Sequence, residues 1–351
     1  MPATSCGRTA SPTTPLDAER GAILVTGGAG YIGSHTAKAL ARSGRRAVVF
    51  DNLSAGHRAA VRWGDLVAAD LHDTEALRRT IRARGVGAVM HFAALTSVAE
   101  SVRDPAAYYR ENLEATLGLL RVMVEEDVRR LIFSSTAAVF GEPRETPITE
   151  AHDTRPINAY GETKLAVERA LGHFDRAYGL RSVALRYFNA AGADPDGEIG
   201  EDHRPEPHLI PLAIAAAAGG EPLRVFGADY PTPDGTCLRD YVHVTDLAEA
   251  HVLALAHLES GGASARYNLG NGHPFSVKEV VAAVERVTGL RVPCAAGPRR
   301  DGDPSVLFAS SERIRRDLGW RPSISSLDEI VRTAWQWHAA HPRGYGDGAE
   351  G

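Results

Sequence analysis

A tyrosine and a lysine lie four residues apart at Tyr160 and Lys164, a spacing that places both on one face of a helix. The apolar segment Leu131–Thr136 precedes them and ends in three hydroxyl side chains. A phenol beside a lysine ammonium and a second cationic group is expected to have a lowered pKa. It can then take a proton from a substrate hydroxyl while a hydride leaves the same carbon. An ordinary helix surface can carry such a pair, but the hydroxyl-rich segment favours acid–base chemistry.

A glycine-rich turn near the N-terminus is typical of a dinucleotide site. Ile23–Val25 form a short apolar run, as in a strand buried on both faces. Gly27, Gly30 and Gly33 follow at intervals of three, before a helical pattern at 35–41. Glycine at these positions permits a tight turn, a close approach of the pyrophosphate to the backbone, and close packing of helix on strand. The start of the helix offers unpaired N–H groups to a phosphate.

An acidic residue in the expected position indicates which dinucleotide binds. The apolar run Ala47–Phe50 ends in Asp51, which is 18 residues after Gly33. A carboxylate there accepts hydrogen bonds from a ribose diol and repels a 2′-phosphate. The sequence therefore predicts NAD rather than NADP. The alternative is that Asp51 is a solvated residue after a strand.

The bulk properties of the chain are those of an intracellular globular protein. Its 351 residues suffice for two domains, and a net charge of −5 argues against a basic nucleic-acid-binding surface. Three widely spaced cysteines, Cys6, Cys237 and Cys294, argue for a reducing cytoplasm, and no apolar run is long enough to span a membrane. Residues 1–20 are rich in Ser, Thr, Pro and Ala and are interpreted as a disordered extension. No Cys/His group has metal-ligand spacing, so no metal site is expected.

Strand and helix patterns alternate along the first half of the chain. The expected strands cover 67–71, 87–94, 131–136 and 182–188, and the expected helices cover 74–84, with Thr74 as N-cap, 105–126 and 160–178. This alternation predicts an α/β fold, with a Rossmann-type doubly wound parallel sheet over residues 21–190. A smaller α/β substrate-binding domain is expected over 191–345, with segments that can return to the first domain. Its expected helices cover 211–218, 245–258 and 276–288, and its expected strands cover 223–226 and 267–269.

The glycine turn, the hydroxyl segment and Tyr160-x-x-x-Lys164 resemble the extended short-chain dehydrogenase/reductase family. Longer motifs resemble its sugar-nucleotide 4-epimerases, and the similarity spans about residues 22–345. These motifs cover residues 25–35, 91–94, 186–189, 200–202, 229–236, 239–244, 267–270 and 299–303.

The resemblance implies an isomerase of galactose metabolism that keeps NAD bound. It would interconvert UDP-glucose and UDP-galactose through a transient 4-keto sugar. Tyr160 would take the proton of the sugar 4-OH, Thr136 would hydrogen-bond O4, and Lys164 would bind the nicotinamide ribose and tune Tyr160. The long helices after Pro105 and over 160–178 often form a homodimer interface in this family.

The resemblance also implies the binding residues, and a pyrophosphate suits planar bidentate arginines among them. For NAD they are Gly27, Gly30, Tyr31, Ile32, Gly33, Asp51, Asn52, Asp70, Leu71, Phe92, Ala93, Ala94, Asn112, Tyr160, Lys164 and Phe188. For the UDP-sugar they are Thr136, Tyr160, Asn189, His208, Leu209, Arg224, Phe226, Arg239, Arg300 and Asp303.

Several positions depart from the common pattern. Thr96 stands where many members have a lysine, and Glu111 replaces an asparagine, so two cofactor contacts are in doubt. Phe140 replaces a tyrosine, and His208 replaces an asparagine but can still donate a hydrogen bond. The segment at 306–307 carries no large tyrosine, which could leave room for an N-acetyl group.

Other functions remain open. A 4-epimerase of another UDP-sugar, such as UDP-GlcNAc, UDP-xylose or a UDP-uronate, would use the same catalytic residues, although no basic partner for a uronate is obvious. A 4,6-dehydratase is disfavoured because Ala137 and Ala138 follow Thr136, where the elimination of water needs an acid and a base. A non-catalytic NAD-sensing regulator is disfavoured because Tyr160 and Lys164 are both present.

Overall fold

A seven-stranded parallel sheet forms the centre of the computed structural model, which describes residues 21–299 and 304–346. The strands lie in the order β11 (Ala265–Leu269), β6 (Arg181–Tyr187), β5 (Arg130–Thr136), β4 (Val86–His91), β1 (Ala22–Thr26), β2 (Ala47–Asp51) and β3 (Asp65–Ala68). This is the doubly wound order, in which the chain direction across the sheet reverses between β1 and β4. Ligands bind at the carboxyl ends of the strands beside that reversal. The expected Rossmann-type fold is confirmed.

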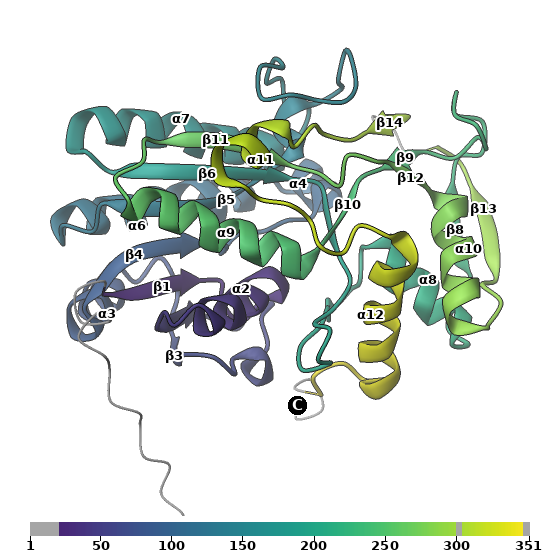
Figure 1. The fold of residues 1–351 in the computed structure, drawn as a ribbon, viewed down its shortest axis with the longest axis horizontal. Helices are drawn as coiled ribbons and strands as arrows, with labels where there is room; N and C mark the ends of the chain where they lie inside the picture. The colour runs from purple at the N-terminus through teal and green to yellow at the C-terminus, as the bar shows by residue number, and fades with distance from the viewer. Residues whose placement is uncertain (1–20, 300–303, 347–351) are drawn as a thin grey trace, which may run out of the picture.

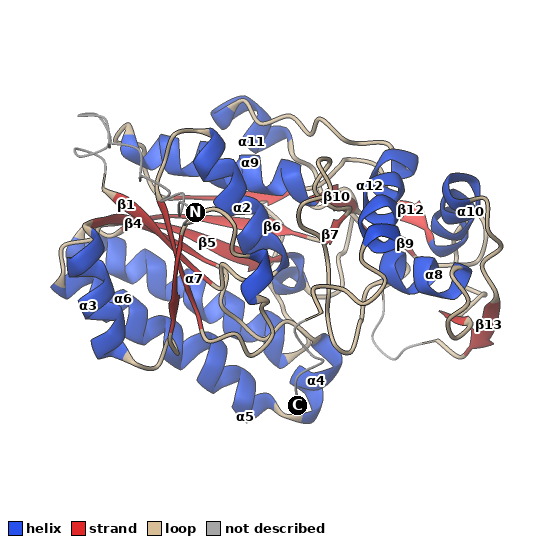
Figure 2. Ribbon diagram, turned by 90° about the horizontal axis from the view of Figure 1, so that it is seen from below, coloured by secondary structure: helices blue, strands red, loops and turns tan. Residues whose placement is uncertain are grey.

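Helices cover both faces of this sheet (Figure 2). One face carries α2 (Tyr31–Arg42), α9 (Val244–Glu259) and α11 (Glu312–Leu318). The other carries α3 (Thr74–Arg84), α6 (Ala115–Glu125) and α7 (Ala159–Tyr178). Ile23 and Val25 pack into the core on the α2 side and Leu24 into the core on the α3 side. The uninterrupted apolar run of β1 is therefore explained by burial on both faces.

The segments after residue 188 form a second region at one end of the molecule (Figure 1). Its core lies among α8 (Leu209–Ala217), α10 (Val277–Thr288) and α12 (Leu327–Ala340). Its short strands pair as β7 (Asn189–Ala191) with β10 (Tyr241–His243), β8 (Leu223–Phe226) with β13 (Cys294–Gly297), and β9 (Leu238–Arg239) with both β12 (Phe275–Ser276) and β14 (Val306–Leu307). Three elements that follow residue 191 belong to the first region: β11 is the edge strand of the seven-stranded sheet, and α9 and α11 pack on that sheet. A domain boundary near residue 190 stays a prediction.

The structure corrects several local expectations. Asp73, not Thr74, caps α3, because its carboxylate accepts a hydrogen bond from Ala76 N at 2.9 Å. The expected helix over 105–126 consists of α5 (Pro105–Tyr108), the wider turns of η2 (Tyr109–Glu114), and α6. The strand expected at 87–94 ends at His91, and the strand expected at 67–71 covers 65–68. Residues 92–94 are thereby left as a loop at the carboxyl end of β4.

Several further elements were not predicted from the sequence. They are α4 (Val98–Arg103), α11, α12, the short helical turns η1 (Arg58–Ala60) and η3 (Ala137–Phe140), and the two-residue strands. None of the helices in the described ranges combines the length and apolarity that a membrane crossing requires. The predicted extension at 1–20 lies outside the described residues.

A buried ion pair ties α7 to the centre of the sheet. Nη2 of Arg186 on β6 lies 2.6 Å from Oε2 of Glu168, and their side chains are 4% and 0% exposed. Oε1 of Glu168 also accepts from Nε of Arg186 at 2.9 Å and from the Ser135 hydroxyl at 2.6 Å. Several hydrogen bonds therefore satisfy the pair, which is the condition under which a buried pair is tolerated.

We predict that Glu168→Leu lowers the free energy of unfolding by about 3–5 kcal/mol, because Arg186 then keeps a buried charge with no counterion. Urea unfolding followed by circular dichroism measures the loss. Asp328→Asn is the matched control, because the Arg286–Asp328 pair is solvent-exposed and such pairs contribute about 0–1 kcal/mol. Equal losses in the two variants would contradict the prediction.

Candidate active site

The glycine turn after β1 is shaped by contacts that exclude side chains. Gly27 has φ of +71°, and a Cβ there would lie 2.5 Å from Ala93 N. A Cβ on Gly33 would lie 2.3 Å from Gly27 O, so α2 packs directly on the turn. A Cβ on Gly30 would meet only Gly27 O, at 3.3 Å. Protein packing thus explains Gly27 and Gly33 more strongly than Gly30, and the milder restriction at Gly30 suits a ligand approaching the backbone.

The carboxylate of Asp51 is fixed against this turn. Its Oδ2 accepts from Ala29 N at 3.0 Å and its Oδ1 accepts from Leu53 N at 2.8 Å. Burial raises the pKa of Asp51, and the two backbone hydrogen bonds oppose the rise. Next to it, Asn52 Nδ2 donates to Asp70 Oδ2 at 2.8 Å. The carboxyl ends of β2 and β3 therefore bring together three residues expected at the ribose and adenine.

These features fit a dinucleotide. The N-terminus of α2 has Gly30 as its N-cap, without a side chain to satisfy the first N–H groups, as a phosphate site requires. The hydroxyl of Tyr31 donates to Gly192 O at 2.6 Å, so this side chain joins the first sheet to the loop after β7. Of the predicted cofactor residues, Leu71 belongs to the core on the α3 side, and Ile32 packs against the core on the α2 side.

The loop at 92–96 follows β4 and is held by Asn112. Asn112 Oδ1 accepts from Leu95 N at 2.8 Å, and its Nδ2 donates to Leu95 O at 2.9 Å. Asn112 is 2% exposed, so the structure shows it positioning the loop. The ring of Phe92 packs on His251 with centroids 4.7 Å apart. Ala93 and Ala94 lie beside it as small, half-buried residues.

Glu111 and Thr96, two of the positions that depart from the common pattern, have surroundings in the structure that do not indicate a direct contact with the cofactor. The carboxylate of Glu111 pairs with Arg110 at 2.6 Å and lies 3.3 Å from His72 Nε2. Thr96 is exposed on the surface of the loop. The ion pair with Arg110 explains how an acidic residue is accommodated there.

The acid–base residues meet where α7 begins beside the carboxyl end of β5. Asn158 caps α7 by accepting from Gly161 N at 2.8 Å, which sets the first turn that carries Tyr160. Lys164 follows one turn later, and its Nζ donates to Ser134 O at 2.8 Å and lies 5.0 Å from the centre of the Phe133 ring. Thr136 ends β5, and its Oγ1 accepts from Ala138 N at 3.1 Å. The structure thus brings the three predicted catalytic residues together.

Burial controls the protonation of this group. It lowers the pKa of Lys164 to about 7, and no described carboxylate lies within ion-pair distance of its ammonium. Burial also raises the pKa of Tyr160, and a hydrogen bond from Thr136 opposes that rise. The sequence predicted a lowered pKa from Lys164 and a nicotinamide together. In the protein alone, desolvation outweighs any effect of Lys164 on the phenol.

The predicted substrate residues lie on several elements of the second region. Asn189 Nδ2 donates to Asp240 O at 2.8 Å, and His208 Nδ1 lies 2.6 Å from Glu201 Oε1. Phe188 packs with Leu307 on a small core that contains Phe140. The remaining described positions are Leu209 at the start of α8, Arg224 and Phe226 on β8, and Arg239 on β9. Arg300 and Asp303 lie outside the described residues.

Asp240 is a residue that the motif contained but sequence reasoning did not select. It is fully buried, and its carboxylate accepts from Asn271 N at 2.7 Å and from Ala309 N at 3.2 Å. Burial raises its pKa to about 7, against those hydrogen bonds. Asp240 joins three loops around the predicted substrate side. An acidic residue directly after Arg239, at the start of the 239–244 motif, was the available signal.

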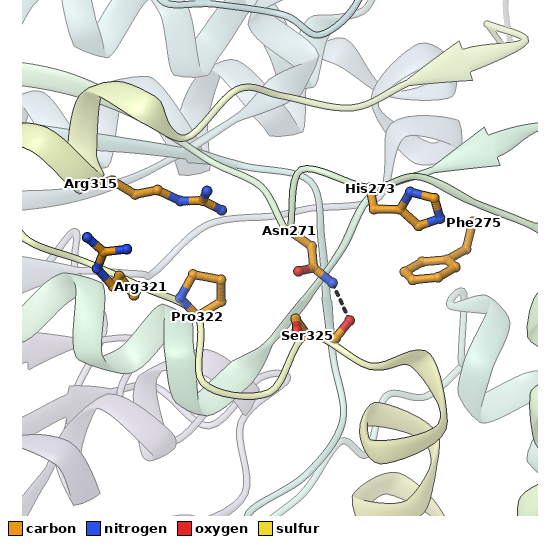
Figure 3. A pocket seen from close by; sticks show the side chains of 7 residues that line it. All are labelled: Asn271, His273, Phe275, Arg315, Arg321, Pro322 and Ser325. Atoms are coloured by element: carbon orange, nitrogen blue, oxygen red, sulfur yellow. Dashed lines mark hydrogen bonds between the residues drawn. The ribbon is translucent and has the colours of Figure 1, made fainter.

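A separate cavity of about 430 Å³ lies between the loop after β11 and the connection from α11 to α12 (Figure 3). Arg315 and Arg321 line one side of it, and Asn271 Nδ2 donates to Ser325 O at 2.7 Å on another. None of its lining residues belongs to the predicted cofactor or substrate set. This cavity is therefore distinct from the acid–base group.

Comparison with known proteins decides the family. Residues 23–270 match the model of the NAD dependent epimerase/dehydratase family. The chain belongs to this family. It is 51% identical to the UDP-glucose 4-epimerase of Halalkalibacterium halodurans, over 92% of this chain and 97% of that protein.

Two solved structures are also similar to this member of the NAD-dependent epimerase/dehydratase family. The UDP-glucose 4-epimerase of Brucella ovis in complex with NAD is 52% identical, with a TM-score of 0.88 over 90% of this chain and 97% of that one. The UDP-glucose 4-epimerase of Bifidobacterium longum in complex with NAD+ and UDP is 37% identical, with a TM-score of 0.88 over 92% and 100%. Family membership confirms the expected cofactor, NAD, and the glycine turn and Asp51 fit it.

We predict that Gly33→Ala lowers the amount of NAD that copurifies with the protein and costs about 1–3 kcal/mol of stability, because the new Cβ overlaps Gly27 O. Cofactor released by acid and quantified by chromatography measures the first effect, and urea unfolding measures the second. Gly172→Ala in α7 is the control, because its Cβ would meet only the flexible Arg176 side chain at 3.7 Å. Full NAD content in Gly33→Ala would refute the role given to the turn.

Proposed function

We propose that the protein is an NAD-dependent isomerase that interconverts UDP-glucose and UDP-galactose by inverting C4 of the sugar through a transient 4-keto sugar. The observation that carries the proposal is the group of Tyr160, Lys164 and Thr136 beside the carboxyl end of β5. It occurs in a chain that is about half identical, over nearly its whole length, to proteins named UDP-glucose 4-epimerase.

The side chains divide the acid–base work between them. Tyr160 removes the proton from the sugar 4-OH and later returns it to O4. Thr136 holds O4 by hydrogen bonding. Lys164, one turn further along the helix, supplies positive charge that favours the phenolate form of Tyr160. When bound, NAD supplies a second positive charge and the group that accepts and returns the C4 hydride.

Burial changes the pKa of both Lys164 and Tyr160, the two titratable groups of this site. Lys164 donates to Ser134 O and forms no ion pair with a carboxylate within the described part of the chain, so no fixed anion competes with ligands for its ammonium form. The raised pKa of Tyr160 in the protein alone keeps the phenol protonated until the positive charge around it increases.

The remaining site residues are proposed from their places in the fold. Arg239 on β9 and Arg300 are the guanidinium groups we assign to the UDP pyrophosphate, and Arg224 on β8 belongs to the strand proposed to contact the nucleotide sugar. Asn189, His208, Leu209, Phe226 and Asp303 complete the proposed nucleotide-sugar contacts. The cofactor set is proposed as predicted, with Asn112 acting through the loop at 92–96.

We also propose a cytoplasmic homodimer. Four large apolar side chains are exposed along neighbouring helical segments, namely Val98 and Val102 on α4, Tyr109 on η2 and Leu117 on α6. Exposed apolar residues on adjacent helices suit an interface with a second copy of the chain.

We predict that the purified protein converts UDP-galactose to UDP-glucose without added NAD, and that Tyr160→Phe lowers kcat about 10²–10⁴-fold because the proton acceptor is lost. A coupled assay for UDP-glucose measures the rates, and the NAD content of the variant should be unchanged. Tyr178→Phe is the matched control, because Tyr178 lies on the same helix and is 52% exposed. An NAD-loaded protein that is inert toward UDP-sugars would favour a regulatory role instead.

Activity on UDP-GlcNAc is a second candidate, favoured by one observation. Leu307 on β14 and Phe188 pack against the same small core, so a leucine stands near a residue that we place at the site. We predict that Leu307→Tyr lowers kcat/KM for UDP-GlcNAc at least tenfold more than for UDP-galactose, because the larger ring fills space next to the sugar. If the native protein excludes UDP-GlcNAc, this candidate is removed.

A further inference from the structure

Four potential metal ligands converge in the loop that joins β7 to α8. Glu201, His203, Glu206 and His208 each place one ligand atom so that all four atoms lie within 4.8 Å of one another. The Glu201 side chain is 4% exposed, whereas the others are 18–41% exposed. They are spaced as Glu-x-His-x-x-Glu-x-His. This spacing mixes carboxylates with imidazoles and so differs from the Cys/His spacing by which the sequence analysis judged metal sites.

The distances match a tetrahedral site. Nδ1 of His208 lies 2.6 Å from Glu201 Oε1 and 3.2 Å from Glu206 Oε1. Nδ1 of His203 lies 3.2 Å from Glu201 Oε1 and 3.6 Å from Glu206 Oε2. Zinc bonds of about 2.0–2.2 Å to nitrogen and oxygen imply ligand–ligand distances of about 3.3–3.6 Å in a tetrahedron. The 2.6 Å contact would need to open by about 0.7–1.0 Å and the two 3.2 Å contacts by a few tenths of an ångström, while the 3.6 Å contact already fits.

The orientation of these atoms is a second observation that points to a ligand. Glu201 is 97% buried, yet its Oε1 has no hydrogen bond of acceptable geometry, and neither has Nδ1 of His203 or of His208. The contacts are short enough for ion pairs between the rings and the carboxylate, yet one buried carboxylate oxygen and two ring nitrogens lack a well-aligned hydrogen bond. This is the arrangement expected of ligand atoms around a common centre.

We propose that Glu201, His203, Glu206 and His208 bind one Zn²⁺ ion. Two imidazole nitrogens and two carboxylate oxygens form a donor set that zinc accepts, and two carboxylates neutralise its charge. Because all four donors come from the protein, the geometry points to a structural site rather than a catalytic one. His208 would bind the ion through Nδ1, which leaves its other ring nitrogen, Nε2, for the proposed contact with the nucleotide sugar.

The site would fasten the second region to the glycine-turn helix. The ring of His203 packs edge-on against Tyr31 at 6.3 Å, and Tyr31 itself is the residue that bonds to Gly192 O. Metal binding at the loop would therefore fix the position of α8 relative to α2. This consequence concerns stability and order and does not depend on the proposed epimerase activity.

The competing state is a pair of protonated histidines held by two carboxylates. Burial alone would lower the pKa of both rings, but Glu201 and Glu206 raise it to about 9 for His203 and about 10 for His208. A second cluster of carboxylates differs because it contains a cation of the protein itself. Lys38 Nζ lies 2.7 Å from a carboxylate oxygen of each of Asp194, Asp196 and Glu198, so its ammonium occupies their centre. Within residues 21–299 and 304–346, none of the four cluster residues forms an ion pair with a lysine or arginine.

The test is metal uptake by the full-length protein without an affinity tag. The protein is treated with EDTA, exchanged into metal-free buffer, incubated with two equivalents of Zn²⁺, desalted and analysed by mass spectrometry for zinc. We expect about one zinc per chain for the native protein and a fall of at least fivefold for the double variant His203→Gln/Glu206→Gln. Asp196→Asn is the matched control, and it should keep full uptake. NAD content and circular dichroism establish that the variants are folded.

The native protein decides the question even if the double variant fails to fold. Bound zinc should raise its thermal unfolding midpoint, and Co²⁺ loaded in place of zinc should give the intense visible absorption of a tetrahedral site. Native protein that retains less than a tenth of an equivalent of zinc would overturn the proposal and identify the cluster as ion pairs. Equal zinc retention by the double variant would overturn it too. UDP-galactose turnover is measured separately, so failure of the metal site is distinguishable from failure of the proposed function.

Discussion

The close approach of α2 to the turn after β1 is the constraint on which the site depends. A single methyl group at Gly33 would lie 2.3 Å from Gly27 O, and one at Gly27 would lie 2.5 Å from Ala93 N. The turn is therefore pressed between the helix and the loop after β4. This packing directs the N-terminus of α2 to the point where the strand order reverses, and it brings Ala29 N to Asp51. The cofactor position follows from backbone packing more than from side-chain contacts.

The structure buries several charged side chains, and they differ in how completely hydrogen bonds and counterions compensate their charge. Glu168 and Arg186 satisfy each other with several aligned hydrogen bonds, so this pair serves structure. Lys164 is buried with a backbone carbonyl and an aromatic face but no described carboxylate, so its charge remains available to a ligand. Glu201 and its histidine neighbours are close but not aligned. A buried group that the protein satisfies incompletely is a candidate for function.

The sequence predicted the parallel sheet, its strand segments, the glycine turn and the acid–base group because each depends on local patterns. Ile23–Val25 show burial directly, and Tyr160 and Lys164 share a helix face by spacing alone. Capping at α3 was assigned one residue too late because Asp73 and Thr74 are both good caps, and only the observed hydrogen bond decides between them.

Other features depend on tertiary contacts that no local pattern contains. Asn112 holds Leu95 across 17 positions, and Asp240 joins loops that are far apart in the sequence. The pKa of Tyr160 was predicted from charge alone, whereas its direction in the protein alone is set by burial. The four ligands around Glu201 become a candidate site only once the loop is folded. The spacing of residues along the sequence does not reveal burial or contacts between distant segments.

The central claim is that the hydrogen leaving C4 returns to C4 of the same sugar while Tyr160 handles only the hydroxyl proton. The most direct test is to incubate the protein with UDP-galactose carrying deuterium at C4 and to analyse the UDP-glucose product by mass spectrometry. We predict that the product keeps the deuterium, even after many turnovers in ordinary water. Product that has exchanged its C4 deuterium for solvent hydrogen would contradict the account.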